Sequence, residues 1–495
     1  MKIIILGLII GIYLVGCSGG EGKVPVTGTT NLPPGSLDKY NEAIDYSTGD
    51  LAHNLLEYIC LPDTTQDDCA KNQENLAGKY NFLVSQVESY TDKVHAYTIT
   101  YSSPGIFGEN RELSGEVLVP NLPESKIKGI LLYYHGTSFT KYDVPSCLGG
   151  KSAKLPSYCN MQSIDSERLS AIMASQGYIV AMPDYVGQGI DNQVMHPYIF
   201  YPENNAISGI NILIATRSLL DKVGYSNTLN LYIGGLSEGG AYSLWATKLI
   251  QTTSAQIIAD SKYNLKLTLG ISGAYDLKDA QMPMELYNIT TDDSNPYNIL
   301  NTGTATAAKP LVISYTLTAY GFYDYNQDYN NLISKAFLEC VPCKLSGKGY
   351  SLNSVFLDTS LDLPALISLI TSSAVITGYG INGNNSAKAL ITGSLENDPQ
   401  FNQKLISASI TSLVTTTPIE LIYLANDSVV TNLNSLNAYN GIKNAAGDDK
   451  ISMEIVNNSL YLFHDKLSNI ETPIDHQQSQ PFLLIAALIK MNQYN

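Results

Sequence analysis

One stretch near the middle of the chain restricts the possible fold more than any other. A short apolar run, Leu231-Tyr232-Ile233, leads into Gly234-Gly235-Leu236-Ser237-Glu238-Gly239-Gly240, and a helical pattern with apolar residues three and four apart begins at once. The order is therefore strand, tight turn, helix. Glycines in such a turn let strand and helix approach closely, and a serine at the bend lifts its hydroxyl clear of the sheet. The helix N-terminus adds partial positive charge where an oxyanion would form, so we predict that Ser237 is a nucleophile.

The five-residue pattern around this serine is weak support when taken alone. Gly16-Cys17-Ser18-Gly19-Gly20 satisfies the same pattern, but it follows a hydrophobic leader. The strand before Ser237 and the helix after it separate the two matches. An ordinary glycine-rich turn is the alternative interpretation of the Ser237 stretch.

Length and charge limit the classes of protein to consider. A chain of 495 residues with 44% hydrophobic residues can form one large domain with an insertion, or two domains. The formal net charge of −16 argues against nucleic acid as a partner, because phosphate binding needs clustered lysine and arginine.

The N-terminus has the features of a secretory signal. One lysine precedes an apolar core that is shorter than the roughly 20 residues of a typical membrane-spanning helix. It ends in Leu14-Val15-Gly16-Cys17, which resembles the bacterial lipoprotein processing box. That resemblance implies a signal over residues 1–17, a lipid on Cys17 as the membrane anchor, and a place in the bacterial cell envelope, facing periplasm or exterior. An ordinary signal peptide cut nearby is the alternative.

Six cysteines remain after Cys17, an even number that suits an oxidising compartment. Local pairing is the simplest expectation, although the sequence does not fix connectivity. Cys340-Val341-Pro342-Cys343 could also be a redox or zinc motif, but without a second pair or nearby histidines a small disulfide loop is favoured. The expected pairs are Cys60 with Cys69, Cys147 with Cys159, and Cys340 with Cys343.

Strand and helix signals alternate along much of the chain. Residues 18 to about 40 resemble a flexible tether, and residues from about 41 to 90 a helical extension, so that 18–94 precede the core. Alternation of strands and helices implies a mostly parallel sheet with right-handed crossovers. The eight strand candidates are 96–101, 115–120, 129–134, 177–182, the run before Ser237, 265–271, 419–424 and 451–456.

Eight strand candidates with the serine after the fifth resemble the α/β-hydrolase superfamily. The segment from Gly177 to Gly189, followed by His196-Pro197-Tyr198, is similar to the loop after the fourth strand in secretory-type lipases of bacteria and fungi. The resemblance implies a core formed by residues 95–275 and 413–495. Residues 276–412 would then be a cap inserted between the sixth and seventh strands, with an independent domain as the alternative.

A serine hydroxyl is a weak nucleophile and needs a histidine base oriented by a carboxylate. In this superfamily the chain order is serine, acid, histidine. His476 directly precedes the final helix and matches the family's histidine, with His464 as competitor. Asp427 follows the seventh strand and resembles the family's Asp-x-x-Val segment, although Thr431 stands where the family often has proline. The alternative interpretation of Asp427 is a solvated loop aspartate without a catalytic role. Less favoured candidates for the triad acid are Asp448, Asp449, Asp465 and Asp475.

The oxyanion hole needs two preorganised N–H donors. One should be the backbone amide of Glu238, the residue after the nucleophile. The loop after the third strand resembles the family's His-Gly loop, which implies Thr137 as the second donor, with Ser138 as the alternative. We interpret His135 in this loop as a structural hydrogen-bonding residue.

Asp184 and His196 lie on the loop after the fourth strand, and we expect both to brace loops around the site. A direct role of either residue with the substrate is the alternative.

Together these features predict a lipid-anchored serine carboxylesterase or lipase that acts on an ester or lipid and needs no metal or organic cofactor. Two other functions stay open. One is a serine peptidase on the same fold, although the segment before residue 95 is too short for the propeller of many such peptidases. The other is a non-catalytic surface protein that uses the fold as a binding platform.

Overall fold

The structure of this chain is a computed structural model. It describes residues 28–47, 90–147, 156–159, 170–286, 303–324, 397–425, 429–456, 461–464, 471–473 and 479–495, together with single residues that include Asp427 and His476. Cys17, Cys60, Cys69, Cys340 and Cys343 lie outside the described residues, as do Asp465 and Asp475.

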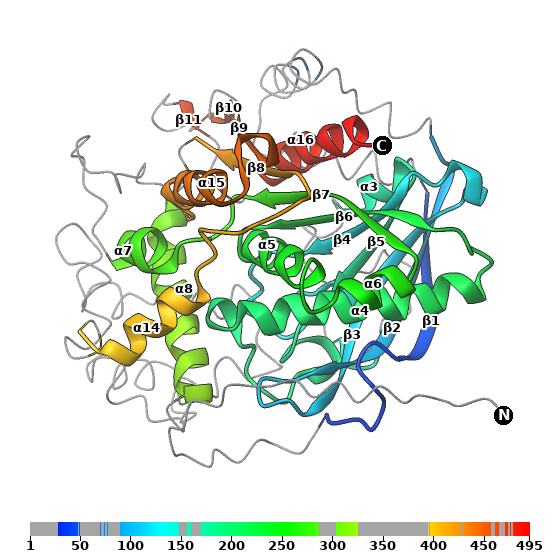
Figure 1. Ribbon diagram of the computed structural model, residues 1–495, viewed down its shortest axis with the longest axis horizontal. Helices are drawn as coiled ribbons and strands as arrows, with labels where there is room; N and C mark the ends of the chain where they lie inside the picture. Colours follow the sequence, from blue (N-terminus) through cyan, green and yellow to red (C-terminus); the bar gives the residue numbers. More distant parts are fainter. Residues whose placement is uncertain are drawn as a thin grey trace.

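A nine-stranded sheet forms the centre of the described structure (Figure 1). Six neighbouring strands are parallel, and three antiparallel strands extend one edge. This architecture confirms the predicted mostly parallel α/β fold. In spatial order the strands are β1 (Leu37–Ser47), β2 (Lys93–Pro104), β3 (Asn110–Pro120), β5 (Tyr178–Pro183), β4 (Gly129–Tyr134), β6 (Leu229–Leu236), β7 (Tyr263–Ile271), β8 (Ile419–Leu424) and β9 (Ile451–Val456).

The outermost strand, β1, corrects the expectation of a tether and a helical extension in this part of the chain. It pairs antiparallel with β2, from Leu37 opposite Tyr101 to Ser47 opposite Lys93. Its sequence, LDKYNEAIDYS, is mostly polar because an edge strand bonds to one neighbour only and shows much of its surface to water. Such a strand has almost no hydrophobic signature. The sheet therefore has one strand more than the eight predicted.

The sequences of the central strands are continuous apolar runs because helices cover both faces of the sheet. All six residues of β4 are buried, and they alternate: Leu131 and Tyr133 join the core on one face, Ile130 and Leu132 the core on the other. Each fully buried leucine or isoleucine contributes about 1.5–3 kcal/mol of transfer free energy. The helices α3 (Ser170–Ser175) and α16 (Gln480–Gln493) cover the first face, and α4 (Pro202–Lys222), α5 (Glu238–Ile250), α6 (Ala255–Asp260) and α15 (Leu433–Ala446) the second (Figure 1).

The chain between β7 and β8 adds helices beside one end of the sheet (Figure 1). Their apolar side chains form a third cluster with residues 195 and 198–200, which lie in the loop between β5 and α4. The described part of the insertion therefore packs on the main body of the protein. The helices are the π-helical turn Leu277–Gln281, α7 (Met282–Leu286), α8 (Gly303–Asp324) and α14 (Pro399–Ala408).

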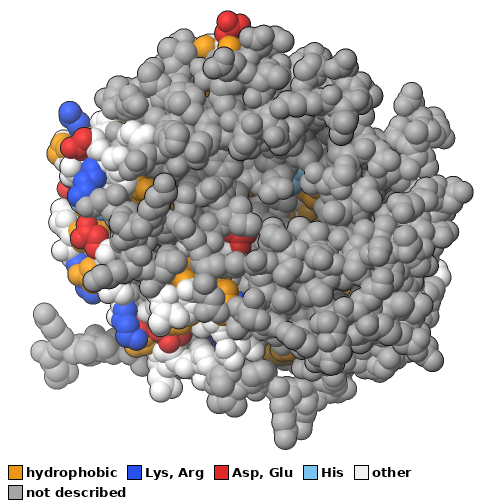
Figure 2. Space-filling view, turned by 180° about the vertical axis from the view of Figure 1, so that it is seen from behind, with side chains coloured by type: hydrophobic (Ala, Val, Ile, Leu, Met, Phe, Trp, Pro, Cys, Tyr) orange, Lys and Arg blue, Asp and Glu red, His pale blue; other side chains and the backbone are white. Residues whose placement is uncertain are grey.

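A short hairpin of β10 (Tyr461–His464) and β11 (Glu471–Pro473) precedes α16. Among the helices in the described part of the chain, none has the length and apolarity to cross a bilayer. On the face in Figure 2, acidic and basic side chains of the described residues are interspersed along one margin.

Candidate active site

Ser237 occupies a strained turn between β6 and α5. Its backbone has φ 58° and ψ −119°, a positive-φ conformation that costs a residue with a Cβ on the order of 1–3 kcal/mol. Backbone hydrogen bonds hold the turn: Ser237 N donates to Ile271 O at 2.8 Å, and Gly240 N donates to Ser237 O at 2.9 Å. The predicted order of strand, tight turn and helix is therefore confirmed.

The glycines around Ser237 are required by close backbone contacts. A Cβ on Gly239 would lie 2.1 Å from Tyr134 O at the end of β4, and one on Gly235 would lie 2.1 Å from Gly239 O. A Cβ on Gly240 would lie 2.8 Å from the Cα of Gly273. Any larger residue would therefore push α5 away from the ends of the neighbouring strands.

His476 lies three residues before the N-cap of α16 and is 7% exposed. Ser479 fixes its backbone, donating its hydroxyl to His476 O at 2.8 Å. The imidazole Nδ1 is 2.6 Å from Asp427 Oδ2. Because an ionised carboxylate only accepts hydrogen bonds, this contact places the ring proton on Nδ1 and leaves a lone pair on Nε2. This is the tautomer that a general base requires.

Asp427 follows β8 and is 4% exposed. Its second oxygen, Oδ1, accepts the backbone N–H groups of Val429 and Val430 at 2.9 and 2.8 Å, so the carboxylate cannot rotate without losing two bonds. Gln281, in the insertion, holds the same loop by donating its amide to Val429 O at 2.8 Å. The acid and the histidine, 49 residues apart in sequence, thus form one fixed pair.

Two of the other acid candidates lie on the surface of the protein. Asp448 and Asp449 are exposed and form surface ion pairs with Lys443 and Lys450. His464, the competing histidine, ends strand β10 opposite Glu471.

Backbone hydrogen bonds place the serine turn and the acid loop on the same edge of the sheet. The turn is bonded to Ile271 at the end of β7, and the next residue, Ser272, donates its N–H to Ile422 O of β8 at 2.8 Å. Asp427 follows Ile422 by five residues. Since ligands of open α/β sheets bind at the carboxyl ends of the strands, this edge is the candidate active site.

The loop after β4 runs directly beside the serine. A Cβ on Gly136 would lie 3.7 Å from the Cβ of Ser237. The next residue, Thr137, is half-buried, and its hydroxyl is 3.2 Å from the hydroxyl of Tyr198. Ser138, the alternative donor, is buried and donates its hydroxyl to Thr140 O within the same loop.

His135 is buried, and its Nδ1 lies 2.7 Å from Gly136 O. Burial lowers the pKa of His135 to about 4, and the ring is therefore neutral at physiological pH. Its ring stacks on Tyr185 with centroids 4.1 Å apart, and Tyr185 donates its hydroxyl to His135 O at 3.0 Å. These contacts agree with the structural role predicted for His135.

The sequence did not reveal Tyr185 and Tyr198 as parts of this site. Both have left-handed backbones, with φ of 72° and 46°. Non-glycine residues in this region are uncommon and gather at functional sites. No sequence signal marks a tyrosine that adopts a positive φ.

Asp184 and His196 brace loops, as expected. Asp184 is fully buried and accepts hydrogen bonds from the hydroxyls of Ser114 and Ser146 and from the Ser146 N–H. Burial raises the pKa of Asp184 to about 6 against the opposing effect of these donors. His196 is also fully buried, and its Nδ1 is 2.9 Å from Val186 O.

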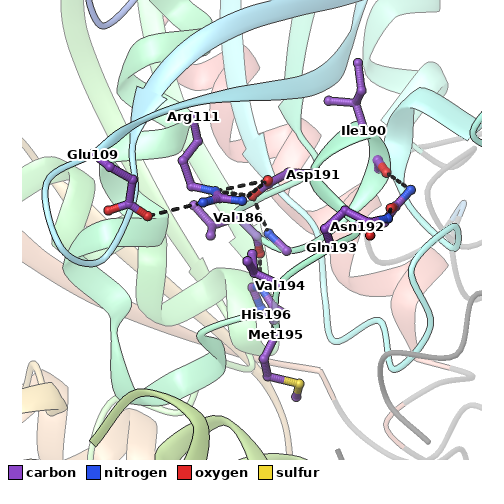
Figure 3. A network of polar contacts seen from close by, with 12 residues as sticks. Glu109, Arg111, Val186, Ile190, Asp191, Asn192, Gln193, Val194, Met195 and His196 are labelled. Atoms are coloured by element: carbon purple, nitrogen blue, oxygen red, sulfur yellow. Dashed lines mark hydrogen bonds and ion pairs between the residues drawn. The ribbon is translucent and has the colours of Figure 1, made fainter. Parts of the chain in front are cut away.

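A buried ion pair joins β3 to the loop between β5 and α4 (Figure 3). The Arg111 guanidinium lies between Glu109 and Asp191, and its Nε and Nη2 donate hydrogen bonds to the Asp191 carboxylate. Lys141 is buried as well, and its ammonium donates to Gly187 O and Val194 O. Burial lowers the pKa of Lys141 to about 7.

One of the three predicted disulfides lies within the described residues. Cys147 and Cys159 are bonded, with Cα atoms 5.6 Å apart, which confirms that pair. In the described part of the chain, no three histidine, cysteine, aspartate or glutamate side chains gather in a way that could hold a metal ion.

A mostly parallel sheet, a strained serine between a central strand and a helix, and a histidine–carboxylate pair on the loops that follow together define the α/β-hydrolase fold. No known protein family model and no curated protein sequence matches this chain.

Solved structures do resemble it. One is a Legionella pneumophila protein assigned as a hydrolase, with a TM-score of 0.62 and 18% identity over 92% of this chain and 98% of that one. Another is a variant of LipA, the rice cell wall degrading esterase of Xanthomonas oryzae, with a TM-score of 0.63 and 17% identity over 93% and 98% of the two chains. At such identities the likeness establishes the fold.

Proposed function

We propose that this protein is a serine hydrolase that cleaves carboxylic esters, with Ser237, His476 and Asp427 as its catalytic triad. The observation that carries the proposal is the 2.6 Å contact between His476 Nδ1 and Asp427 Oδ2 on the sheet edge where Ser237 is held in a strained turn. The esterase activity of LipA, which has the same fold, supports esters as the substrate class.

In the first half of the reaction, Ser237 Oγ attacks the ester carbonyl while His476 Nε2 takes the hydroxyl proton. Asp427 stabilises the imidazolium that forms. The carbonyl oxygen becomes an oxyanion, which the backbone N–H groups of Glu238 and Thr137 would bind. The tetrahedral intermediate then breaks its bond to the alcohol, which leaves with the proton from His476.

In the second half, water attacks the acyl-enzyme and gives its proton to His476. The acid is released, and the proton returns to Ser237. Each step uses only groups of this chain and water.

We assign the insertion between β7 and β8 to a cap over this edge. Its described helices contribute Tyr315 and Tyr320 from α8, which contact Tyr198 and Phe200 in the loop before α4 at ring distances of 4.8 and 5.2 Å. Tyr198 also bonds Thr137 in the proposed oxyanion loop. This aromatic cluster favours esters with an apolar acyl or alcohol group.

The proposal includes a lipid anchor on Cys17 and an envelope location. The Cys147–Cys159 disulfide supports an oxidising compartment. Growth of a bacterial expression host with radiolabelled palmitate should label the wild-type protein but not Cys17→Ser. Equal labelling of both would contradict the anchor.

The central experiment is hydrolysis of p-nitrophenyl esters of increasing chain length by the purified protein. Ser237→Ala should abolish turnover, whereas Ser226→Ala, on an exposed serine, should leave it unchanged. A fluorophosphonate probe should label the wild type and not Ser237→Ala. Full ester turnover by Ser237→Ala would disprove the mechanism, and turnover of amides alone would indicate a peptidase.

A further inference from the structure

A buried histidine–glutamate pair lies next to the nucleophile, and neither the triad nor the predicted oxyanion hole accounts for it. Glu238 Oε1 is 2.7 Å from His196 Nε2 and 2.5 Å from the hydroxyl of Tyr242. Glu238 is 2% exposed and His196 is fully buried. The glutamate belongs to the first turn of α5, and the histidine comes from the loop between β5 and α4.

The hydrogen bonds fix the number of protons that the pair holds. His196 Nδ1 faces Val186 O, which can only accept, so Nδ1 carries a proton. Tyr242 donates to Glu238 Oε1. One further proton must lie between His196 Nε2 and Glu238, since two bare acceptors would repel each other. Whichever atom holds that proton, the pair has no net charge.

We propose that His196 is a positioning residue that neutralises Glu238, so that no uncompensated negative charge lies beside the developing oxyanion. The inference rests on the proposed function, because the backbone N–H of Glu238 is the expected oxyanion donor. Without its partner, the buried carboxylate of the same residue would oppose an oxyanion bound to that N–H. His196 also ties the loop between β5 and α4 to the first turn of α5.

Three tyrosines and one histidine around the pair stay neutral between about pH 5 and pH 9. Burial raises the pKa of Tyr198, Tyr242 and Tyr315 well above its usual value and lowers that of His135 to about 4. The remaining neighbours are Tyr185, stacked on His196, and the buried Glu285 near Tyr198.

The test compares His196→Gln, Glu238→Gln and the double variant, each assayed for ester hydrolysis from about pH 6 to pH 9. His196→Gln should lower kcat by about 10–100-fold with little change in KM, because the carboxylate acts on the transition state. Glu238→Gln and the double variant should each have a higher kcat than His196→Gln, because neither retains a buried charge at this position. His95→Gln removes a more exposed histidine–glutamate contact, to Glu42 at the sheet edge, and serves as the control.

The pH dependence separates charge from packing. The ratio of His196→Gln activity to double-variant activity should fall as pH rises. Without His196, the Glu238 side chain opposes the oxyanion only when it is ionised. A ratio near one at every pH, or a Glu238→Gln variant as slow as His196→Gln, would overturn the proposal.

Urea denaturation gives a readout that does not depend on catalysis. Burial without a partner raises the folded-state pKa of a carboxyl above its unfolded value, so stability is lost as pH rises. The urea midpoint of His196→Gln should therefore fall relative to the double variant between about pH 5 and pH 8. If the urea midpoints of the two variants changed with pH in the same way, the proposed pairing of His196 with Glu238 would be wrong, whether or not the wild type hydrolysed esters. Absence of ester turnover in the wild type would instead reject the proposed function.

Discussion

Changing Asp427 to asparagine should inactivate the enzyme by forcing His476 into the wrong tautomer. Asp427 Oδ1 accepts the N–H groups of Val429 and Val430, so the amide oxygen of an asparagine must take that position. The amide NH2 then occupies the Oδ2 position, 2.6 Å from His476 Nδ1. Two donors cannot face each other, and the imidazole must move its proton to Nε2. Nε2 can then no longer accept the proton of Ser237.

The size of the effect follows from the alternatives open to the side chain. Turning the amide over would restore the histidine tautomer but would place NH2 against the N–H groups of Val429 and Val430. Each buried donor left without an acceptor costs about 1–3 kcal/mol. The wrong tautomer is therefore the favoured state. In a Ser-His-Asp triad that state lowers kcat by about 10⁴-fold, or about 5 kcal/mol in activation free energy.

The assay is kcat/KM for a p-nitrophenyl ester, measured beside the thermal midpoint. Asp427→Asn should lose about 10⁴-fold in kcat while remaining folded, because the change is nearly isosteric. Asp448→Asn, at an exposed aspartate, should match the wild type. An Asp427→Asn variant within tenfold of wild type would refute the assignment of Asp427 as the acid.

Three further predictions follow from the geometry. Gly239→Ala must displace α5 from β4 by about 1 Å and should lower ester turnover by about 100-fold. Gly136→Ala is the control, because its added Cβ would make only ordinary van der Waals contacts, and it should keep the wild-type thermal midpoint. Because burial lowers the pKa of His135 from 6.5 to about 4, the histidine contributes roughly 3 kcal/mol of stability above pH 6.5 that is lost as pH falls toward 4. Urea titrations should show this loss in wild type but not in His135→Phe. Replacing both Cys147 and Cys159 by serine should lower the free energy of unfolding by about 3 kcal/mol and leave ester turnover intact, as calorimetry and the ester assay would show.

The sequence revealed those parts of the fold that have a local signature. Buried parallel strands such as β4 are continuous apolar runs, and the Ser237 turn combines glycines with a strand before it and a helix after it. Asp427 could be predicted because it closes such a strand, and His476 because it directly precedes the last helix. The structure brings these two side chains into contact.

Other features have no local signature. Strand β1 is polar because it lies at the sheet edge. The pairing of His196 with Glu238 joins residues 42 positions apart, and each side chain alone resembles an ordinary loop or helix residue. The backbone conformation of Tyr198 depends on tertiary contacts, among them its bond to Thr137 and its ring contact with Tyr315. Such features become visible only when the fold brings the segments together.

The same reasoning explains why a five-residue pattern is a poor predictor of a nucleophile and the fold around it a good one. Gly16–Gly20 and Gly235–Gly239 have the same spacing of glycine and serine. The Gly235–Gly239 pattern differs from the other because it lies against the Tyr134 carbonyl at the end of β4, which leaves no room for a Cβ on Gly239. The neighbouring strand and the helix that begins at Glu238 then hold Ser237 in its turn with a positive φ. The glycines are thus a consequence of that packing, and a pattern without the adjacent strand and helix carries no prediction of chemistry.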